Sequence, residues 1–430
     1  MHSFYGFVWG QCIWCILNTY LICLHRFCMN LAPPSNAVHK LSTTDTPDWG
    51  WPLLRLGFRP FYLGAAVFAA LSVPCWLLMW AGVVTHPPAL APLLWHAHEI
   101  LYGFAVAVVV GFLLTAGKAW TGLPTPRGSW LGALALLWLA ARIAGLGAPY
   151  LVYAVLDVAL LPIVAGALLS VLLRAKNRRN LPLVGILALL ALVNGAFHLS
   201  VLGLIDWPAL HALHAALALI VMIECVMGGR VIPFFTANVT PGLKIAPWPR
   251  FEFAVLGVTA LALLAWVAQA QGTWTVALLA LAAGLNAWRQ LRWAPWKTLT
   301  RPILWVLHLA YAWIPVGFAL LALAQAGLAP PTAGIHALGV GATGGLIIGM
   351  VTRTARGHTG RPLQVGPIET AAYMLMMLAA LLRVGAPLLA PQALVTGLAL
   401  AGGAWALAFL LYLFQYAPWL LRPRTDGKDG

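Results

Sequence analysis

Long apolar runs alternate along most of the chain with short segments that contain charges, prolines or turn residues. Each run is about 20 residues long, the length at which an α-helix crosses the hydrocarbon core of a bilayer. We therefore predict twelve membrane-spanning helices in one bundle, because no linker between the runs is long enough to separate domains. Their approximate ranges are 61–82, 96–118, 130–147, 150–173, 181–204, 210–235, 251–270, 274–291, 302–326, 333–352, 368–389 and 392–416.

The composition supports a protein that lies in the lipid bilayer. Hydrophobic residues make up 62% of the 430 residues and charged residues only 8%, so a soluble core cannot hide the apolar surface. The 21 tryptophans and 16 phenylalanines also exclude intrinsic disorder. The predicted fold class is an all-α membrane protein, with a leader at 1–54, a twelve-helix membrane domain at 55–421 and a cytoplasmic tail at 422–430.

The charge pattern predicts the orientation in the membrane. A formal net charge of +15 would suggest nucleic-acid binding in a soluble protein, but here the basic residues occupy short loops between apolar runs. With a cytoplasmic N-terminus, all but two of the 25 lysines and arginines fall in inside segments, and the exceptions are Arg142 and Arg383. We therefore predict no nucleic-acid partner, both termini in the cytoplasm and a location in the bacterial inner membrane.

The first 28 residues form an unusual leader. Phe4 to Leu24 is apolar enough for a thirteenth helix or a signal sequence, but no basic segment precedes it and no cleavage site is evident. A metal site that includes His25 is a less favoured alternative. We expect translation to begin at Met29, so that residues 1–28 are not translated. Four of the six cysteines lie in this leader: Cys12, Cys15, Cys23 and Cys28.

Histidines are the most informative polar residues in the predicted spans. Neutral imidazole is inexpensive to bury and is a preferred ligand of haem iron and copper. On a regular helix His96 and Glu99 share a face, and His98 points away from His96. The alternative is that each histidine lies near the interface and is satisfied by a carbonyl group. The predicted metal ligands, all toward the outer surface, are His96, His98, His198, His211, His214 and His336.

Other polar residues are candidates for supporting roles. Asp157 is expected either to orient a ligand imidazole or to pair with Arg142. Glu224 is either a proton-relay group or a hydrogen-bonded buried acid. His308 lies toward the cytoplasmic side, and Tyr311 three residues later suggests a hydrogen-bonded pair or a second cofactor level.

A basic, glycine-containing segment from Arg353 to Arg361 is predicted to be a loop that contains His358. Such a loop suits a haem propionate or a lipid phosphate. The alternative is an ordinary cytoplasmic loop with turn glycines.

Several short motifs, in a fixed order, resemble the NnrS family of haem- and copper-containing inner-membrane proteins. The resemblance covers about residues 55 to 421. The motifs are Gly57-Phe-Arg-Pro-Phe61, Trp95-His-Ala-His-Glu-Ile-Leu-Tyr-Gly-Phe104, Gly111-Phe-Leu-Leu-Thr115, Trp120-Thr-Gly122, Gly228-Gly-Arg-Val-Ile-Pro-Phe-Phe-Thr-Ala-Asn238, Leu304-Trp-Val-Leu-His308, His336-Ala-Leu-Gly-Val-Gly341, Thr352-Arg-Thr354 and Gly357-His-Thr-Gly-Arg-Pro362.

The resemblance implies a twelve-helix protein of the nitric oxide response that relieves nitrosative stress, with haem b bound through membrane histidines and copper as a further cofactor. It implies nitric oxide as the ligand and identifies no redox partner. His198 fits less closely, and His211 and His214 rest on their depth alone. The residues at family motif positions are His96, His98, His308, His336, His358, Glu99, Arg230 and Arg353.

Two other functions remain open. One is a redox enzyme such as a nitric oxide or oxygen reductase, although the chain has no adjacent pair of histidines for a compact copper centre beside a haem. The other is a secondary transporter, which twelve spans with buried Glu224, Asp157 and Arg230 would suit. The absence of an evident repeat between the two halves, and the number of histidines, favour the haem protein.

Overall fold

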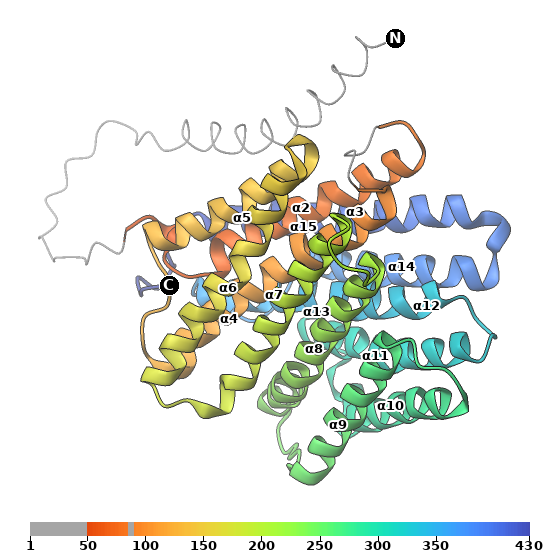
Figure 1. Cartoon of the computed structure of the whole chain (residues 1–430). Helices are drawn as coiled ribbons and strands as arrows, with labels where there is room; N and C mark the ends of the chain where they lie inside the picture. Colours follow the sequence, from red (N-terminus) through yellow and green to blue (C-terminus); the bar gives the residue numbers. More distant parts are fainter. Residues whose placement is uncertain (1–49, 85–89) are drawn as a thin grey trace, which may run out of the picture.

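The computed structural model describes residues 50–84 and 90–430, so the predictions for residues 1–28 fall outside the described residues. Every regular element in this part is helical (Figure 1). The main elements are α2 (Phe58–Trp80), α3 (Pro92–His98), η2 (Glu99–Ala105), α4 (Val106–Thr121), α5 (Ser129–Gly147), α6 (Tyr150–Arg174), α7 (Leu181–Val201), α8 (Ala209–Val239), α9 (Pro249–Val267), α10 (Thr273–Leu291), α11 (Pro302–Gln325), α12 (Pro331–His336), η5 (Ala337–Gly344), α13 (Gly345–His358), α14 (Pro367–Leu389) and α15 (Leu394–Leu420). Four short 3-10 turns join them: η1 (Pro52–Leu54), η3 (Arg178–Asn180), η4 (Pro295–Thr298) and η6 (Pro391–Ala393).

The helices begin and end where local sequence favours it. Pro92, Pro249 and Pro302 each open a helix, at a position where the missing N–H has no intrahelical partner to lose. The backbone N–H of Gly366 donates to the Glu369 carboxylate at 2.9 Å and so caps the start of α14. Gly122 ends α4 with a φ of 70°, a conformation that favours glycine.

Eleven helices of the described part are long and apolar enough to cross a membrane. An all-helical, multi-pass architecture is therefore confirmed. The predicted eighth span coincides with α10, which is not among the eleven, because its last two turns carry Asn286, Arg289 and Gln290. The count of twelve spans, and the orientation of the two ends, stay predictions.

The helices form one bundle around a continuous apolar core. The last helix, α15, packs against both α14 and α2, so the end of the chain returns to its first described helix. Arg59, at the start of α2, donates to the carbonyl of Leu420 at 2.7 Å and of Arg422 at 2.9 Å. In Figure 1, α9 and α10 form one edge of the bundle, and α5 and α6 form another.

Two helices of the described residues contain a π-helical segment. The first runs unbroken from Pro92 to Thr121 and contains η2, and the second runs from Pro331 to His358 and contains η5. Each π segment starts directly after a predicted ligand, η2 after His98 and η5 after His336. Because π segments occur often at functional sites, these two places are candidate functional sites.

Candidate functional site

A group of buried polar side chains lies between α3, α5, α6 and α7, and we call it the polar cluster. Tertiary packing brings its members together from four helices that are apolar on most of their surface. The polar cluster consists of His98, Glu99, Arg142, Tyr150, Tyr153, Asp157, Asn194 and His198.

Both ring nitrogens of His98 have partners. Its Nδ1 atom lies 3.2 Å from Glu99 Oε1 and 2.8 Å from the hydroxyl of Tyr153. Its Nε2 atom lies 3.0 Å from Asn194 Oδ1 and 3.3 Å from Asp157 Oδ2. The imidazole is completely buried, so these contacts replace the hydrogen bonds that it would make with water.

Arg142 joins the two carboxylates of the polar cluster. Its guanidinium donates to Glu99 Oε2 at 2.7 Å and forms an ion pair with Asp157 Oδ1. The pairing of Asp157 with Arg142, one of the two predicted roles of this acid, is therefore confirmed. Two carboxylates face one guanidinium, so the polar cluster can accept one further positive charge from a protonated imidazole or a metal ion.

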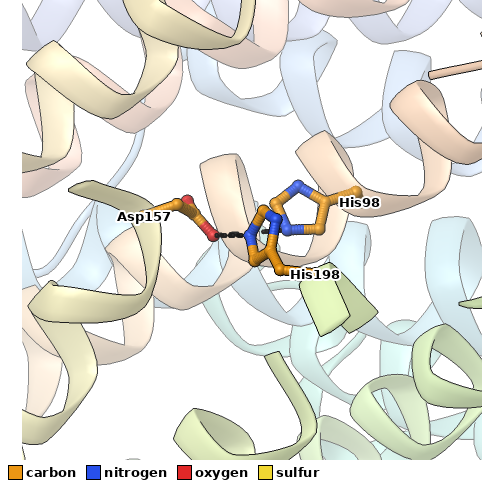
Figure 2. A group of neighbouring side chains, drawn as sticks. All are labelled: His98, Asp157 and His198. Carbon is orange, nitrogen blue, oxygen red and sulfur yellow. Dashed lines mark hydrogen bonds and ion pairs between the residues drawn. The ribbon is translucent and has the colours of Figure 1, made fainter. Parts of the chain in front are cut away.

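The donor atoms of His98, Asp157 and His198 lie within 4.8 Å of one another (Figure 2). The Nε2 atoms of both histidines face one carboxylate oxygen, Asp157 Oδ2, at 3.3 and 3.2 Å. This is close to the ligand spacing around a tetrahedral ion with bonds of about 2.0 Å. His198 Nδ1 lies 2.9 Å from the hydroxyl of Tyr150, an outer contact of the kind that orients ligand imidazoles. Two imidazoles and a carboxylate fit a copper or zinc ion.

A second feature, which we call the histidine cavity, lies between α3, α8, α12 and α14. It has a volume of about 220 Å³ and an almost entirely apolar lining. Its polar lining residues include His96, His214, His336 and Arg383. His96 and His336 come from the two helices that contain π segments.

Two of the histidines that line the histidine cavity have a ring nitrogen without a partner in the described part of the chain. The Nδ1 atoms of His96 and His214 have no hydrogen-bond partner among the described residues. His96 stacks on Trp76, with ring centroids 4.0 Å apart. His336 Nδ1 lies 2.7 Å from the carbonyl oxygen of Thr332, and this contact orients the ring and leaves Nε2 available.

The residues of the histidine cavity fit a haem in their chemistry. Imidazole nitrogens suit the iron, the apolar lining suits the macrocycle, and the Arg383 guanidinium suits a propionate. The volume of about 220 Å³ is below the range of about 300–1,000 Å³ that is usual for ligand pockets. Side chains such as Trp76 would therefore have to move to admit the group.

Comparison with known families identifies the chain. The model of the NnrS protein family matches residues 52–424. The chain belongs to the NnrS family. Membership associates it with the nitric oxide response and confirms the resemblance that its motifs indicated. A search of curated proteins gave no significant match.

The NnrS motif Trp95–Phe104 contributes to both features. His96 lines the histidine cavity, whereas His98 and Glu99 belong to the polar cluster. His96 and Glu99, which the i+3 spacing predicts on one face, contact different helices, because Glu99 pairs with Arg142 of α5 and His96 stacks on Trp76 of α2. His98 does point away from His96, as the spacing predicted. The six histidines predicted as metal ligands thus form no single centre.

Three of the predicted histidines lie in neither feature. His211 is beside His214, with ring centroids 6.3 Å apart, but does not line the histidine cavity. His308 Nε2 lies 2.9 Å from the Thr236 hydroxyl, and its Nδ1 atom has no partner in the described part of the chain. His358 packs against Phe58 at a centroid distance of 5.5 Å.

Tyr311 does not form the predicted pair with His308. Its hydroxyl donates to Asn286 Oδ1 at 2.8 Å and accepts from Arg289 at 3.0 Å. Tyr311 therefore supports α10 and not a histidine ligand. The i+3 spacing places the two residues on one broad face of α11. The Tyr311 side chain contacts α10, however, whereas the His308 ring contacts Thr236 of α8.

The segment predicted as a basic loop is mostly helical. Helix α13 continues to His358, so the loop starts only at Thr359. An ion pair between Arg356 and Glu369 of α14 anchors this last turn of α13. The two predicted cofactor arginines have protein partners: Arg353 lies over the ring of Phe235 at 3.7 Å, and Arg230 donates to Asn180 Oδ1 at 2.8 Å.

Sequence reasoning did not place Tyr150, Tyr153, Asn194, Trp76 and Arg383 in a site. One signal was available. Arg142 and Arg383 are the two basic residues that break the predicted inside pattern. Arg142 lies in the polar cluster and Arg383 lines the histidine cavity. An arginine that breaks the predicted pattern of basic residues was thus a pointer to each site.

Proposed function

We propose that this NnrS protein is a haem-containing inner-membrane protein that binds nitric oxide and protects the cell against nitrosative stress. The observation that carries this proposal is the histidine cavity, an apolar space lined by three histidines and an arginine, where two of the imidazoles have a buried nitrogen without a hydrogen-bond partner among the described residues. Unpaired buried nitrogens are costly unless a ligand engages them.

His96 and His336 would hold the haem, and Arg383 would hold a propionate. When bound, the haem supplies an iron that takes nitric oxide as a ligand. The contact of His336 with the Thr332 carbonyl would keep Nδ1 protonated and Nε2 free. The apolar lining would exclude water and admit nitric oxide, a small uncharged molecule. His214 lines the same cavity and is a further candidate for a haem ligand.

The polar cluster is the proposed site of copper. His98 and His198 would supply Nε2 atoms and Asp157 would supply Oδ2, while Arg142 keeps its ion pair with the other oxygen. The surplus of one carboxylate in the polar cluster favours a bound cation. The same charge balance also suits a protonated imidazole, so metal content is the decisive measurement.

Both termini are proposed to be cytoplasmic, which places the histidine cavity and the polar cluster toward the periplasm. The support is the distribution of basic residues. A reporter fused after Lys428 should be active only if it is one that works in the cytoplasm. Activity of a periplasmic reporter there would contradict the orientation.

The optical spectrum of the purified protein tests the proposal most directly. We expect a haem b spectrum that changes when nitric oxide is added. His96→Ala or His336→Ala should abolish or shift it, whereas His211→Ala, an adjacent imidazole outside the cavity, should leave it unchanged. Loss of protection against nitric oxide should accompany loss of haem.

Two results would contradict the proposal. A wild-type protein without haem would favour a transporter, and wild-type spectra in both ligand variants would place the haem elsewhere, with His308 as the next candidate. Sustained consumption of nitric oxide with an electron donor would instead identify a reductase. For copper, metal analysis should show an ion that His198→Ala removes and His211→Ala retains.

A further inference from the structure

Glu224, in the middle of α8, differs from the other acidic residues on the described helices. Each of the others forms an ion pair with an arginine, whereas Glu224 forms none, and its Oε2 atom has no hydrogen-bond partner among the described residues. The paired acids are Glu99 and Asp157 with Arg142, Glu252 with Arg289, and Glu369 with Arg356.

Glu224 is one of the residues that line a cavity of about 90 Å³, which has almost entirely apolar walls and lies apart from both sites described above. Residues of α2, α4, α8, α11, η5 and α13 line it, and none of them is an arginine, lysine or histidine. The hydroxyl of Thr343 in η5 faces the carboxyl group and also lacks a partner that meets normal hydrogen-bond geometry. Two polar groups without partners therefore share an otherwise apolar space.

The other titratable groups around Glu224 do not compensate a negative charge. Tyr62 lines the cavity, but its hydroxyl is directed to Thr354. Cys225 is the next residue and is fully buried. Arg289 of α10 reaches the neighbouring Cys225 carbonyl, but its guanidinium is already occupied by Glu252 and by that carbonyl.

An ionised carboxylate in such a place costs several kcal/mol, because neither water nor a cation stabilises it. A protonated carboxyl group avoids this cost and can both donate and accept a hydrogen bond.

We propose that Glu224 is a proton-binding site in the interior of the bundle, where its carboxyl group is neutral and pairs with the hydroxyl of Thr343. The ligand is a proton. This site depends on neither haem nor copper, and it stands even if the proposed function fails.

Infrared spectroscopy of the purified full-length protein tests the proposal. At neutral pH the wild-type protein should show the carbonyl stretch of a protonated carboxylic acid, and this band should shift in D₂O. Glu224→Gln should remove the band, and it should fold normally because an amide is close in shape to a neutral carboxyl group. Asp206→Asn, which neutralises an exposed acid in a loop, should keep it.

A second pair of variants tests the geometry without changing Glu224. Thr343→Val removes the facing hydroxyl and should shift the band. Thr352→Val, at a buried threonine that already donates to the Ile348 carbonyl at 2.7 Å, should not. A wild-type spectrum without the band, a band that survives Glu224→Gln, or a band that ignores Thr343→Val would overturn the proposal.

Discussion

The polar cluster and the histidine cavity offer imidazoles in opposite conditions. In the polar cluster, each ring nitrogen of His98 and His198 contacts a protein oxygen. In the histidine cavity, nitrogens of His96 and His214 have no partner in the described part of the chain. The polar cluster is compact enough for one small ion, whereas the histidine cavity offers apolar space for a larger group.

The difference shows that burial alone does not identify a cofactor ligand. His96 and His98 are two residues apart on one helix, yet one is held by stacking and the other by hydrogen bonds. The imidazoles of the polar cluster already have protein partners for their ring nitrogens. The histidine cavity leaves hydrogen-bonding capacity unused, so it gains most from a ligand.

The largest expected effect follows from removing the cation of the polar cluster. Arg142→Met leaves Glu99 and Asp157 buried without their partner and should lower the free energy of unfolding by about 3–5 kcal/mol. Thermal unfolding in detergent would measure the change. Combining it with Glu99→Gln and Asp157→Asn should recover much of the loss, and a stable single variant would contradict the role of the ion pairs.

A smaller effect should separate the two neighbouring histidines. His98→Ala leaves buried oxygens without a partner, which costs about 1–3 kcal/mol for each unsatisfied group. His96→Ala loses a stacking contact worth about 0.5–1.5 kcal/mol. Unfolding of the cofactor-free protein should therefore be affected more by His98→Ala. Equal losses would show that the two environments do not differ in stability.

Two glycines provide a matched test of packing. A Cβ atom at Gly103 would come within 2.6 Å of Phe68 and 2.9 Å of Glu99 Oε2, so Gly103→Ala should cost about 1–3 kcal/mol. Gly339 lines the histidine cavity, and a Cβ atom there meets nothing within 4 Å. Gly339→Ala should change stability by no more than about 1 kcal/mol. If Gly339→Ala unfolds the protein as readily, the cavity is not open space.

The smallest expected effect concerns the edge of the polar cluster. Tyr150→Phe removes the hydroxyl that contacts His198 Nδ1 and should cost about 1 kcal/mol, because Tyr150 is only half-buried. If copper is present, the same change should weaken its retention, as loss of an outer contact to a ligand imidazole commonly does. Metal analysis after dialysis would detect this, with Tyr102→Phe as the control at a neighbouring buried tyrosine.

Much of the fold was predictable because lipid imposes a simple rule. A segment in hydrocarbon must satisfy its backbone internally, so long apolar runs became helices close to the predicted ranges. Helix α10 is the exception, because it forms where predicted but is too polar to count among the eleven candidate spans. Its polar residues Asn286, Arg289 and Gln290 are buried against α9 and α11. Hydropathy measures the segment alone and cannot include such partners.

The site was predictable only in its residue types. The sequence identified the histidines, Asp157 and the family, but regular helical geometry assigned Glu99 to the face of His96. Glu99 pairs with Arg142 of α5 and His96 stacks on Trp76 of α2, so neighbouring helices draw the two side chains apart. Similarly, α13 extended through His358 because Glu369 of another helix anchors its last turn through Arg356.

By itself, the sequence determined that this is a helical membrane protein of the NnrS family. It also showed histidines within apolar spans and two arginines that break the predicted pattern of basic residues. Those properties depend on composition and on order along the chain. Only the tertiary structure decided that Asp157 and Arg142 meet His98 and His198, that His96 and His336 face a shared cavity, and that Glu224 is left without a cation. The reason is physical: the cost or value of a polar group in lipid depends on which partners neighbouring helices bring within hydrogen-bond distance.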